Sequence, residues 1–161
     1  MVAVDPFYVQ VAAYTGAALC MGLGAVGAAI GEGYTGGRVV ESINRQPAES
    51  GILLRTMVLG QAIAETSGIF ALIVAIMILF GSFSATLPTV FALIGAGLST
   101  GFAGLGTGTG AGIVSAAANA GIARQPETAP KETFTMVLGQ AISQTTGMYA
   151  LGISLILLIL G

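Results

Sequence analysis

The chain has little of what a water-soluble protein needs at its surface. Only 7% of its 161 residues are charged, against about 25% in an ordinary soluble domain. It contains no histidine, no tryptophan and a single cysteine. These absences exclude a disulfide framework, a zinc cluster and a histidine general base. Five basic residues and a net charge of -2 also exclude nucleic acid as a partner.

The residues that are present are mostly apolar or glycine. Apolar residues make up 55% of the chain, and 25 positions are glycine. A membrane-spanning helix needs about 20 mostly apolar residues, and backbone that faces lipid must be helical. The sequence therefore predicts an all-α integral membrane protein. The four expected spanning helices are 8–44, 52–80, 87–122 and 132–160.

The breaks between these helices are polar and contain proline. Gln46-Pro47 and Gln125-Pro126 end the first and third helices, because proline stops a helix. All five basic residues cluster around these two Gln-Pro turns. They are Arg38, Arg45, Arg55, Arg124 and Lys131. By the positive-inside rule, the two turns are expected in the cytoplasm and both termini outside.

The two halves of the chain are copies of one helical hairpin. A shift of 79 residues aligns 16–81 with 95–160, and 24 of the 66 positions are identical. Thr56–Leu72 and Thr135–Leu151 share 12 of 17 residues. A half that is a complete structural unit indicates stacking against further copies of itself. The expected hairpin units are 1–81 and 82–161.

Glycine recurs along the first and third helices. These glycines are Gly22, Gly24, Gly27, Gly31 and Gly33, then Gly97, Gly101, Gly104, Gly106, Gly108, Gly110 and Gly112. In lipid, small residues permit the close approach by which helices associate. Glycines two residues apart lie on different faces of a helix, so more than one face has no side chains. This predicts helices with close neighbours on both sides, as in a tight ring. Residues 22–27 also fit a dinucleotide-binding loop, but no strand precedes them.

Glu65 is the main candidate for a functional residue. It lies 18 residues beyond Pro47 inside an apolar helix, and a carboxylate in the bilayer is a functional hypothesis by default. Glu32 lies 15 residues before Pro47, so both carboxylates reach about 22–27 Å along their helices at about 1.5 Å per residue. Such a pair is expected to share a proton unless a cation lies between them. The alternatives are that Glu65 only joins helices and that Arg38 neutralises Glu32.

The second hairpin differs at both acidic positions. Gln144 replaces Glu65, and Ala111 replaces Glu32. The Gln144 side chain can coordinate an ion or form hydrogen bonds, but it cannot change its charge.

Hydroxyl and carbonyl oxygens surround both positions. Thr66 and Thr145 follow them, and Ile63 and Ile142 precede them. Threonine hydroxyls and main-chain carbonyls are hard oxygen donors, which suit a small dehydrated cation. Threonine also bonds its own helix one turn back, and this alternative stays open for both threonines.

These residues resemble a known family. Arg45-Gln46-Pro47, followed by 57–66 with its carboxylate and preceded by a glycine-rich helix, strongly resembles the c subunit (proteolipid) of rotary F-type ATP synthases. The resemblance covers nearly the whole chain, twice over. It implies a ring with the glycine-rich helices inside and the carboxylate-bearing helices outside. Such a ring turns in membrane lipid against a stator a subunit, while each carboxylate binds and releases one ion.

The resemblance also implies which residues contact partners and ions. Sodium-carrying members have Gln or Glu at the position of Glu32, a hydroxyl at Thr66 and a main-chain oxygen at Ile63. We therefore expect Na+ at Glu65, with H+ as the alternative, one ion per chain and no other cofactor. The other expected ligands, from a neighbouring hairpin, are Gln144, Thr145 and Ile142. The expected contacts with the central stalk are Arg45, Gln46, Pro47, Arg124, Gln125 and Pro126.

Two departures from the usual family pattern matter. The chain is a fused double hairpin, as in vacuolar-type proteolipids, and its second half has lost the carboxylate. A vacuolar-type proton-translocating proteolipid is therefore the alternative function. Rings made only of this chain and rings mixed with single hairpins both stay open. Duplicated proteolipids of this kind also occur in anaerobic bacteria, so a bacterial plasma membrane is the expected location.

Other classes of function fit the sequence less well. A passive channel needs a continuous polar lining, whereas one carboxylate interrupts otherwise apolar helices here. A structural proteolipid has no use for Glu65. Catalysis by the chain itself is not expected, because it has no nucleophile–base pair, and ATP chemistry would belong to partner subunits.

Overall fold

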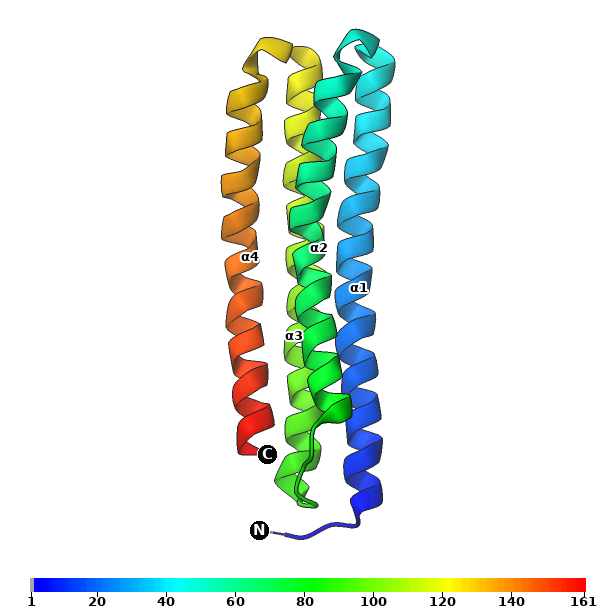
Figure 1. The fold of residues 1–161 in the computed structure, drawn as a ribbon, viewed down its shortest axis with the longest axis vertical. Coiled ribbons are helices and arrows are strands. Elements are labelled where there is room, and N and C mark those ends of the chain that lie inside the picture. Colours follow the sequence, from blue (N-terminus) through cyan, green and yellow to red (C-terminus); the bar gives the residue numbers. More distant parts are fainter. Residues whose placement is uncertain (1) are drawn as a thin grey trace.

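The computed structural model describes residues 2–161, and nearly all of them are helical (Figure 1). The elements are α1 (Pro6–Arg45), η1 (Pro47–Glu49), α2 (Ser50–Phe80), α3 (Leu87–Arg124), η2 (Pro126–Thr128) and α4 (Ala129–Leu160). All four long helices are long and apolar enough to cross a membrane. The all-α fold class expected from the sequence is confirmed. The helix bounds differ from the expected ones most at the start of α4, which is residue 129 instead of 132.

The Gln-Pro turns have the same structure in both hairpins. Gln46 ends α1 and donates its backbone N–H to the Ser42 carbonyl, and Gln125 ends α3 with the same bond to Gly121. A short 3-10 turn then begins at each proline, because proline has no N–H with which to continue the α-helix. Both turns lie at one end of the bundle, opposite the two termini (Figure 1).

The glycine-rich helices α1 and α3 make the most extensive contact in the bundle. A Cβ atom added to Gly31 would collide with the backbone of Gly108 and Gly112, and one added to Gly97 would collide with Gly16. Close approach of this kind requires glycine on both helices. Thr35 strengthens it, because its hydroxyl lies 3.0 Å from the Gly112 carbonyl oxygen, to which it can donate.

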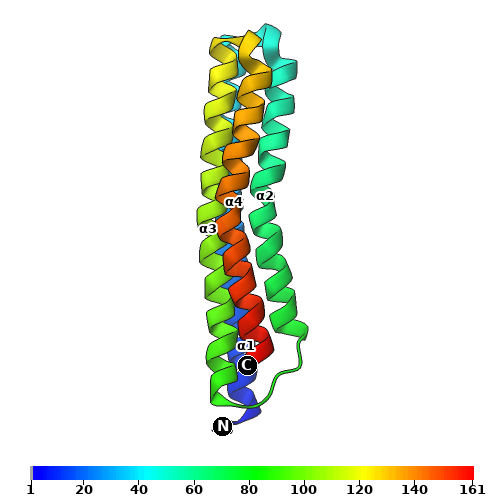
Figure 2. The same ribbon diagram turned by 90° about the vertical axis from the view of Figure 1, so that its left-hand side faces the viewer.

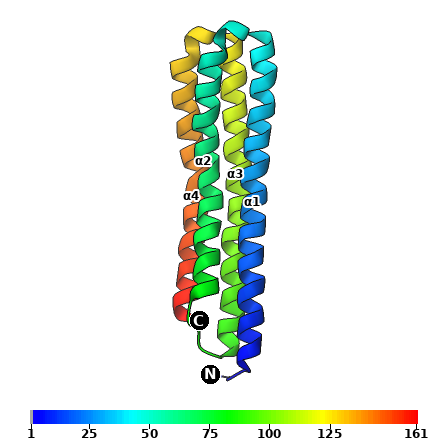
Figure 3. The same cartoon turned by 45° about the vertical axis from the view of Figure 1, so that its right-hand side comes forward.

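The other two helices, α2 and α4, contact one another far less than α1 and α3 do. Figure 1 shows α4 standing apart from α2, and Figure 2 and Figure 3 show the same four helices from two other sides. Their outer faces expose large apolar side chains, which suits contact with lipid. Examples are Ile69, Ile76, Ile153 and Ile156. The bundle is therefore tight along α1 and α3 and spread along α2 and α4.

Candidate functional site

The two acidic residues of the first hairpin lie together. The carboxyl groups of Glu32 on α1 and Glu65 on α2 lie next to each other. A Cβ atom at Gly68 would lie 3.6 Å from a Glu65 carboxyl oxygen and 3.6 Å from the Ala28 Cβ. The Glu65 carboxyl thus lies over Gly68, on the side of α2 that packs against Ala28 of α1.

One oxygen of this pair lacks a bonding partner. Within residues 2–161, the buried Oε1 atom of Glu32 has no hydrogen-bond partner. A buried carboxyl oxygen beside a second carboxyl is unfavourable unless a proton or a cation joins them. Arg38 does not supply that charge, because its guanidinium pairs with Glu41 at 2.8 Å. The alternative in which Arg38 neutralises Glu32 is therefore wrong in this structure.

The Ile63 carbonyl belongs to a second group of polar residues. It accepts the Thr66 hydroxyl at 2.6 Å and the Nε2 atom of Gln144, from the other hairpin, at 3.2 Å. The Gln144 side chain is only 8% exposed. In the described part of the chain, no hydrogen bond joins this group to Glu32 or Glu65. The expected ligands thus fall into two groups within one chain.

The matching oxygens of the second hairpin face outward. The Thr145 hydroxyl donates to the Ile142 carbonyl at 2.7 Å, as Thr66 does to Ile63. Both threonines thus bond their own helix, three residues back. Ile142 is 72% exposed and Thr145 is also exposed. Within the single chain, this carbonyl and hydroxyl have no amide facing them of the kind that Gln144 supplies to Ile63.

Two glutamines that sequence reasoning missed connect the helices at this level. The Gln61 amide donates to the Glu32 carbonyl at 3.0 Å. Its counterpart Gln140 donates to the Ala111 carbonyl at 2.9 Å and to the Gly60 carbonyl of the other hairpin at 3.0 Å. The signal for both was present, since they occupy the same place in the most strongly repeated block of the sequence.

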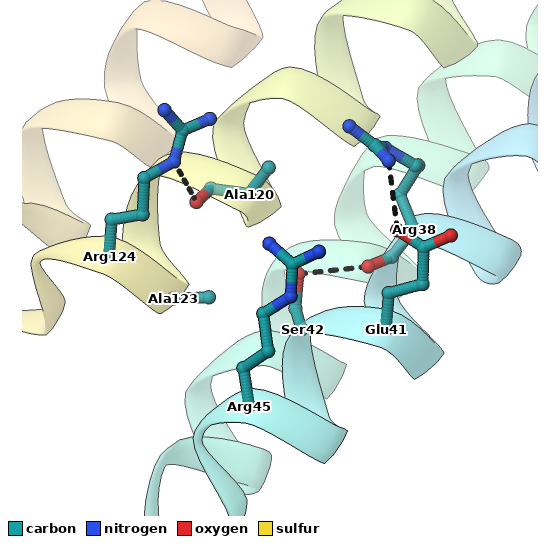
Figure 4. A pocket seen from close by; sticks show the side chains of 7 residues that line it. All are labelled: Arg38, Glu41, Ser42, Arg45, Ala120, Ala123 and Arg124. Carbon is teal, nitrogen blue, oxygen red and sulfur yellow. Dashed lines mark hydrogen bonds and ion pairs between the residues drawn. The ribbon is translucent and has the colours of Figure 1, made fainter.

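A basic cluster lies at the Gln-Pro end of the bundle. Arg38, Arg45 and Arg124 surround a cavity of about 40 Å³ between the ends of α1 and α3 (Figure 4). Arg124 donates to the Ala120 carbonyl at 3.2 Å. Of the residues expected to contact a stalk, Arg45, Pro47, Arg124 and Gln125 are exposed, and Gln46 and Pro126 are half-buried.

The acidic side chains of the site are a pair and not a larger cluster. Within the described residues, no group of three or more His, Cys, Asp or Glu side chains could hold a metal ion. The acidic pair instead joins the two neighbouring helices α1 and α2, with Glu32 half-buried and Glu65 exposed in the single chain. One carboxyl pair without a basic partner can gain or lose a single positive charge at little structural cost.

Comparisons with known proteins point to one family. The family model for the C subunit of ATP synthase matches the chain twice, over residues 15–78 and 94–157. The ATP synthase c subunit of Natranaerobius thermophilus is 46% identical over 74 residues, which are 46% of this chain and 85% of that protein. The corresponding protein of Thermotoga maritima is 48% identical over 66 residues, which are 41% of this chain and 78% of that protein.

A third relative shows the same relation in length. The ATP synthase c subunit 2 of Cereibacter sphaeroides is 42% identical over 77 residues, which are 48% of this chain and 93% of that protein. Each relative is therefore about as long as one hairpin of this chain. The two matches of the family model fit the two hairpins of the fold.

Proposed function

Because the chain belongs to the family of ATP synthase C subunits and carries the family domain twice, we propose that it binds and carries one cation at Glu65 as part of a rotating membrane ring. As a member of this family it is a non-catalytic component of an ATP synthase. The observation that carries the proposal is the acidic pair Glu65 and Glu32, which lies between two membrane-spanning helices without a basic partner.

The internal repeat supports assembly with further copies. Five small residues of α3 lie buried against α1: Gly97, Gly101, Gly104, Gly108 and Gly112. Their counterparts 79 residues earlier are also small: Ala18, Gly22, Ala25, Ala29 and Gly33. All of these are exposed except Ala25, which is half-buried. The helix α1 therefore presents an uncovered copy of the face by which α3 packs inside the chain.

A second copy of the chain can cover this face. The matching surface on its α3 consists of Gly95, Gly106 and Gly110, the counterparts of Gly16, Gly27 and Gly31. The middle of this surface is open, because a Cβ atom at Gly106 would meet nothing within 4 Å, while Gly95 and Gly110 at its ends are half-buried beside α4. Contacts between two different faces repeat from copy to copy, and they produce a ring when the rotation closes. The tight α1–α3 side would form the inside of the ring.

The same repeat supports an ion site between copies. Inside the chain, the Gln144 amide donates to the Ile63 carbonyl. At the contact between copies, the counterpart of Gln144 is Glu65 of one copy, and the counterpart of Ile63 is Ile142 of its neighbour. A carboxylate there faces a carbonyl, and two acceptors attract one another only through a cation or a proton between them.

The number of oxygens favours Na+ as the ion. Glu65 and Glu32 of one copy would meet the Ile142 carbonyl and the Thr145 hydroxyl of the next. Four hard oxygen ligands suit a small dehydrated metal cation, whereas a proton needs only one acceptor and one donor. Proton transport by a vacuolar-type proteolipid is the second candidate, and the double-hairpin architecture favours it.

The basic end supports one orientation in the membrane. By the positive-inside rule, the arginines around the Gln-Pro turns favour a cytoplasmic side for these turns, with both termini outside. Arg45 and Arg124 would then meet central-stalk subunits there, while the a subunit faces Glu65 within the membrane. A bacterial plasma membrane is the location that we propose.

Labelling by a carbodiimide tests both the ion and its site. A carbodiimide modifies protonated carboxyl groups in apolar surroundings, so Na+ at fixed pH should slow the modification of Glu65, and K+ should not. The variants Thr145→Val and Thr66→Val form a matched pair. The first should need a higher Na+ concentration for the same protection, because three of the four oxygen ligands remain, and the second should keep it unchanged. If pH changes the rate and Na+ does not, the ring carries protons and the sodium assignment is wrong.

A further inference from the structure

Amide donors join the two hairpins of the chain to one another. The Gln144 amide nitrogen lies 3.2 Å from the Ile63 carbonyl, and that of Gln140 lies 3.0 Å from the Gly60 carbonyl. Gln140 is fully buried, and Gln144 is 8% exposed. A carbonyl oxygen can only accept a hydrogen bond, so it is the nitrogen of each side chain that faces α2.

The Gln144 side chain lies where the repeat would place the carboxyl of Glu65 and its ion. Its nitrogen bonds the Ile63 carbonyl, which also accepts the Thr66 hydroxyl. The counterparts of these two oxygens, at Ile142 and Thr145, are the ones that we assign to the ion between copies. At Ala111 the second hairpin also lacks the carboxyl that Glu32 supplies in the first. The contact between the two hairpins of one chain thus has the same carbonyl and hydroxyl oxygens as the proposed ion site between copies. It lacks both carboxyl groups of that site.

We propose that Gln144 is a permanent substitute for the ion, which keeps the contact between the two hairpins closed and free of ions throughout rotation. This inference rests on the proposed function, since it compares the two kinds of contact in the ring. An ion can leave its site, whereas a covalently attached amide cannot. Opening the contact would also take from the buried Gln144 amide nitrogen its hydrogen bond to the Ile63 carbonyl.

One consequence is a ring that opens at only half of its hairpin contacts. The four helices of a chain would move past the stator as one rigid unit, and ions would enter and leave only between chains. The buried surroundings of the amide agree with a closed contact. A Cβ atom at Gly147 would lie 3.9 Å from the Oε1 atom of Gln144 and 3.5 Å from the Thr107 hydroxyl, and both of these atoms are buried.

The test compares two thiols at equivalent positions. Thr66→Cys places a thiol at the contact inside the chain, and Thr145→Cys places one at the contact between copies. Both are made in the assembled complex after Cys20→Ala, which removes the one native thiol, already buried. A small cationic methanethiosulfonate reagent should modify the thiol at 145, at a rate that falls when Na+ is added at fixed pH. The thiol at 66 should react about tenfold or more slowly, without response to Na+, because hydrogen bonds hold its contact closed. All rates are compared at one pH, because the thiolate is the reacting form of every cysteine.

A second pair of variants assigns the protection to Gln144. Gln144→Ala should raise the rate at position 66 toward the rate at position 145. Gln144→Glu keeps the size of the side chain and should make the rate at 66 depend on cations. Equal rates at 66 and 145 in the native background would overturn the inference. So would a rate at 66 that neither substitution changes.

The proposed function fails separately from this inference. If Glu65 is not the ion site, Glu65→Gln will leave the response of the thiol at 145 to ions unchanged. The effect of Gln144→Ala on the thiol at 66 does not depend on that result. Fast reaction at 66 with an intact ion response at 145 would overturn only the role of Gln144.

Discussion

Two glycines of α3, only two residues apart, should respond in opposite ways to the same substitution. A Cβ atom at Gly108 would lie 2.7 Å from the Ala28 nitrogen, the Gly27 carbonyl carbon and the Ser67 hydroxyl oxygen. Ordinary contacts begin at 3.4 Å, so α1 must move away by 3.4 minus 2.7, or about 0.7 Å. A Cβ atom at Gly106 would meet nothing within 4 Å.

The pair isolates the packing energy of the α1–α3 contact. Gly106→Ala and Gly108→Ala both gain about 1 kcal/mol of helix propensity, so this gain cancels when the two variants are compared. Overpacking in a tight contact costs about 1–3 kcal/mol. The Gly108→Ala chain should therefore unfold with a free energy about 1–3 kcal/mol lower than that of Gly106→Ala.

The assay is denaturation of single chains in mild detergent, followed by loss of helical circular dichroism. Equal stabilities of the two variants would refute the close α1–α3 packing. Ring assembly supplies the second measurement. Gly106 is the counterpart of Gly27, where a Cβ would collide with the neighbouring backbone, so Gly106→Ala should give stable chains that form few rings. A normal yield of rings would refute the repeated contact.

Three further outcomes follow from the site and the fold. Glu32→Gln keeps an oxygen ligand and removes one titrating group, so Na+ should still slow labelling of Glu65, with a weaker dependence on pH; complete loss of protection would mean that Glu32 must be charged. The number of labelled carboxyls in a ring should equal its number of chains and not its number of hairpins. Each charge that crosses 100 mV yields about 2.3 kcal/mol, so such a ring gains half the energy per turn of a ring with the same number of single hairpins. This smaller gain favours pumping of ions driven by ATP. Asp5→Ala should lower the unfolding free energy by about 1 kcal/mol, because Asp5 caps α1 by accepting the Phe7 N–H at 2.9 Å; an unchanged melting temperature would contradict this.

The sequence alone determined the elements of the fold and indicated Glu65 as the main candidate for a functional residue. Uncharged stretches of spanning length set the helices, because lipid admits no unpaired backbone. The proline at each Gln-Pro turn removed an N–H and so ended α1 and α3 in the same way. The repeat gave two hairpins, and the carboxylate of Glu65 stood out because few charges are tolerated within a membrane.

Only the tertiary structure decided which oxygens share a site. Proximity in sequence suggested that Ile63 and Thr66 serve the same ion as Glu65, but the fold pairs them with Gln144 instead. The face that a helix turns toward each neighbour depends on how closely α1 and α3 pack, and glycine backbones set that distance. Residues 100° apart on one helix can therefore belong to different interfaces, because each interface covers only one side of the helix.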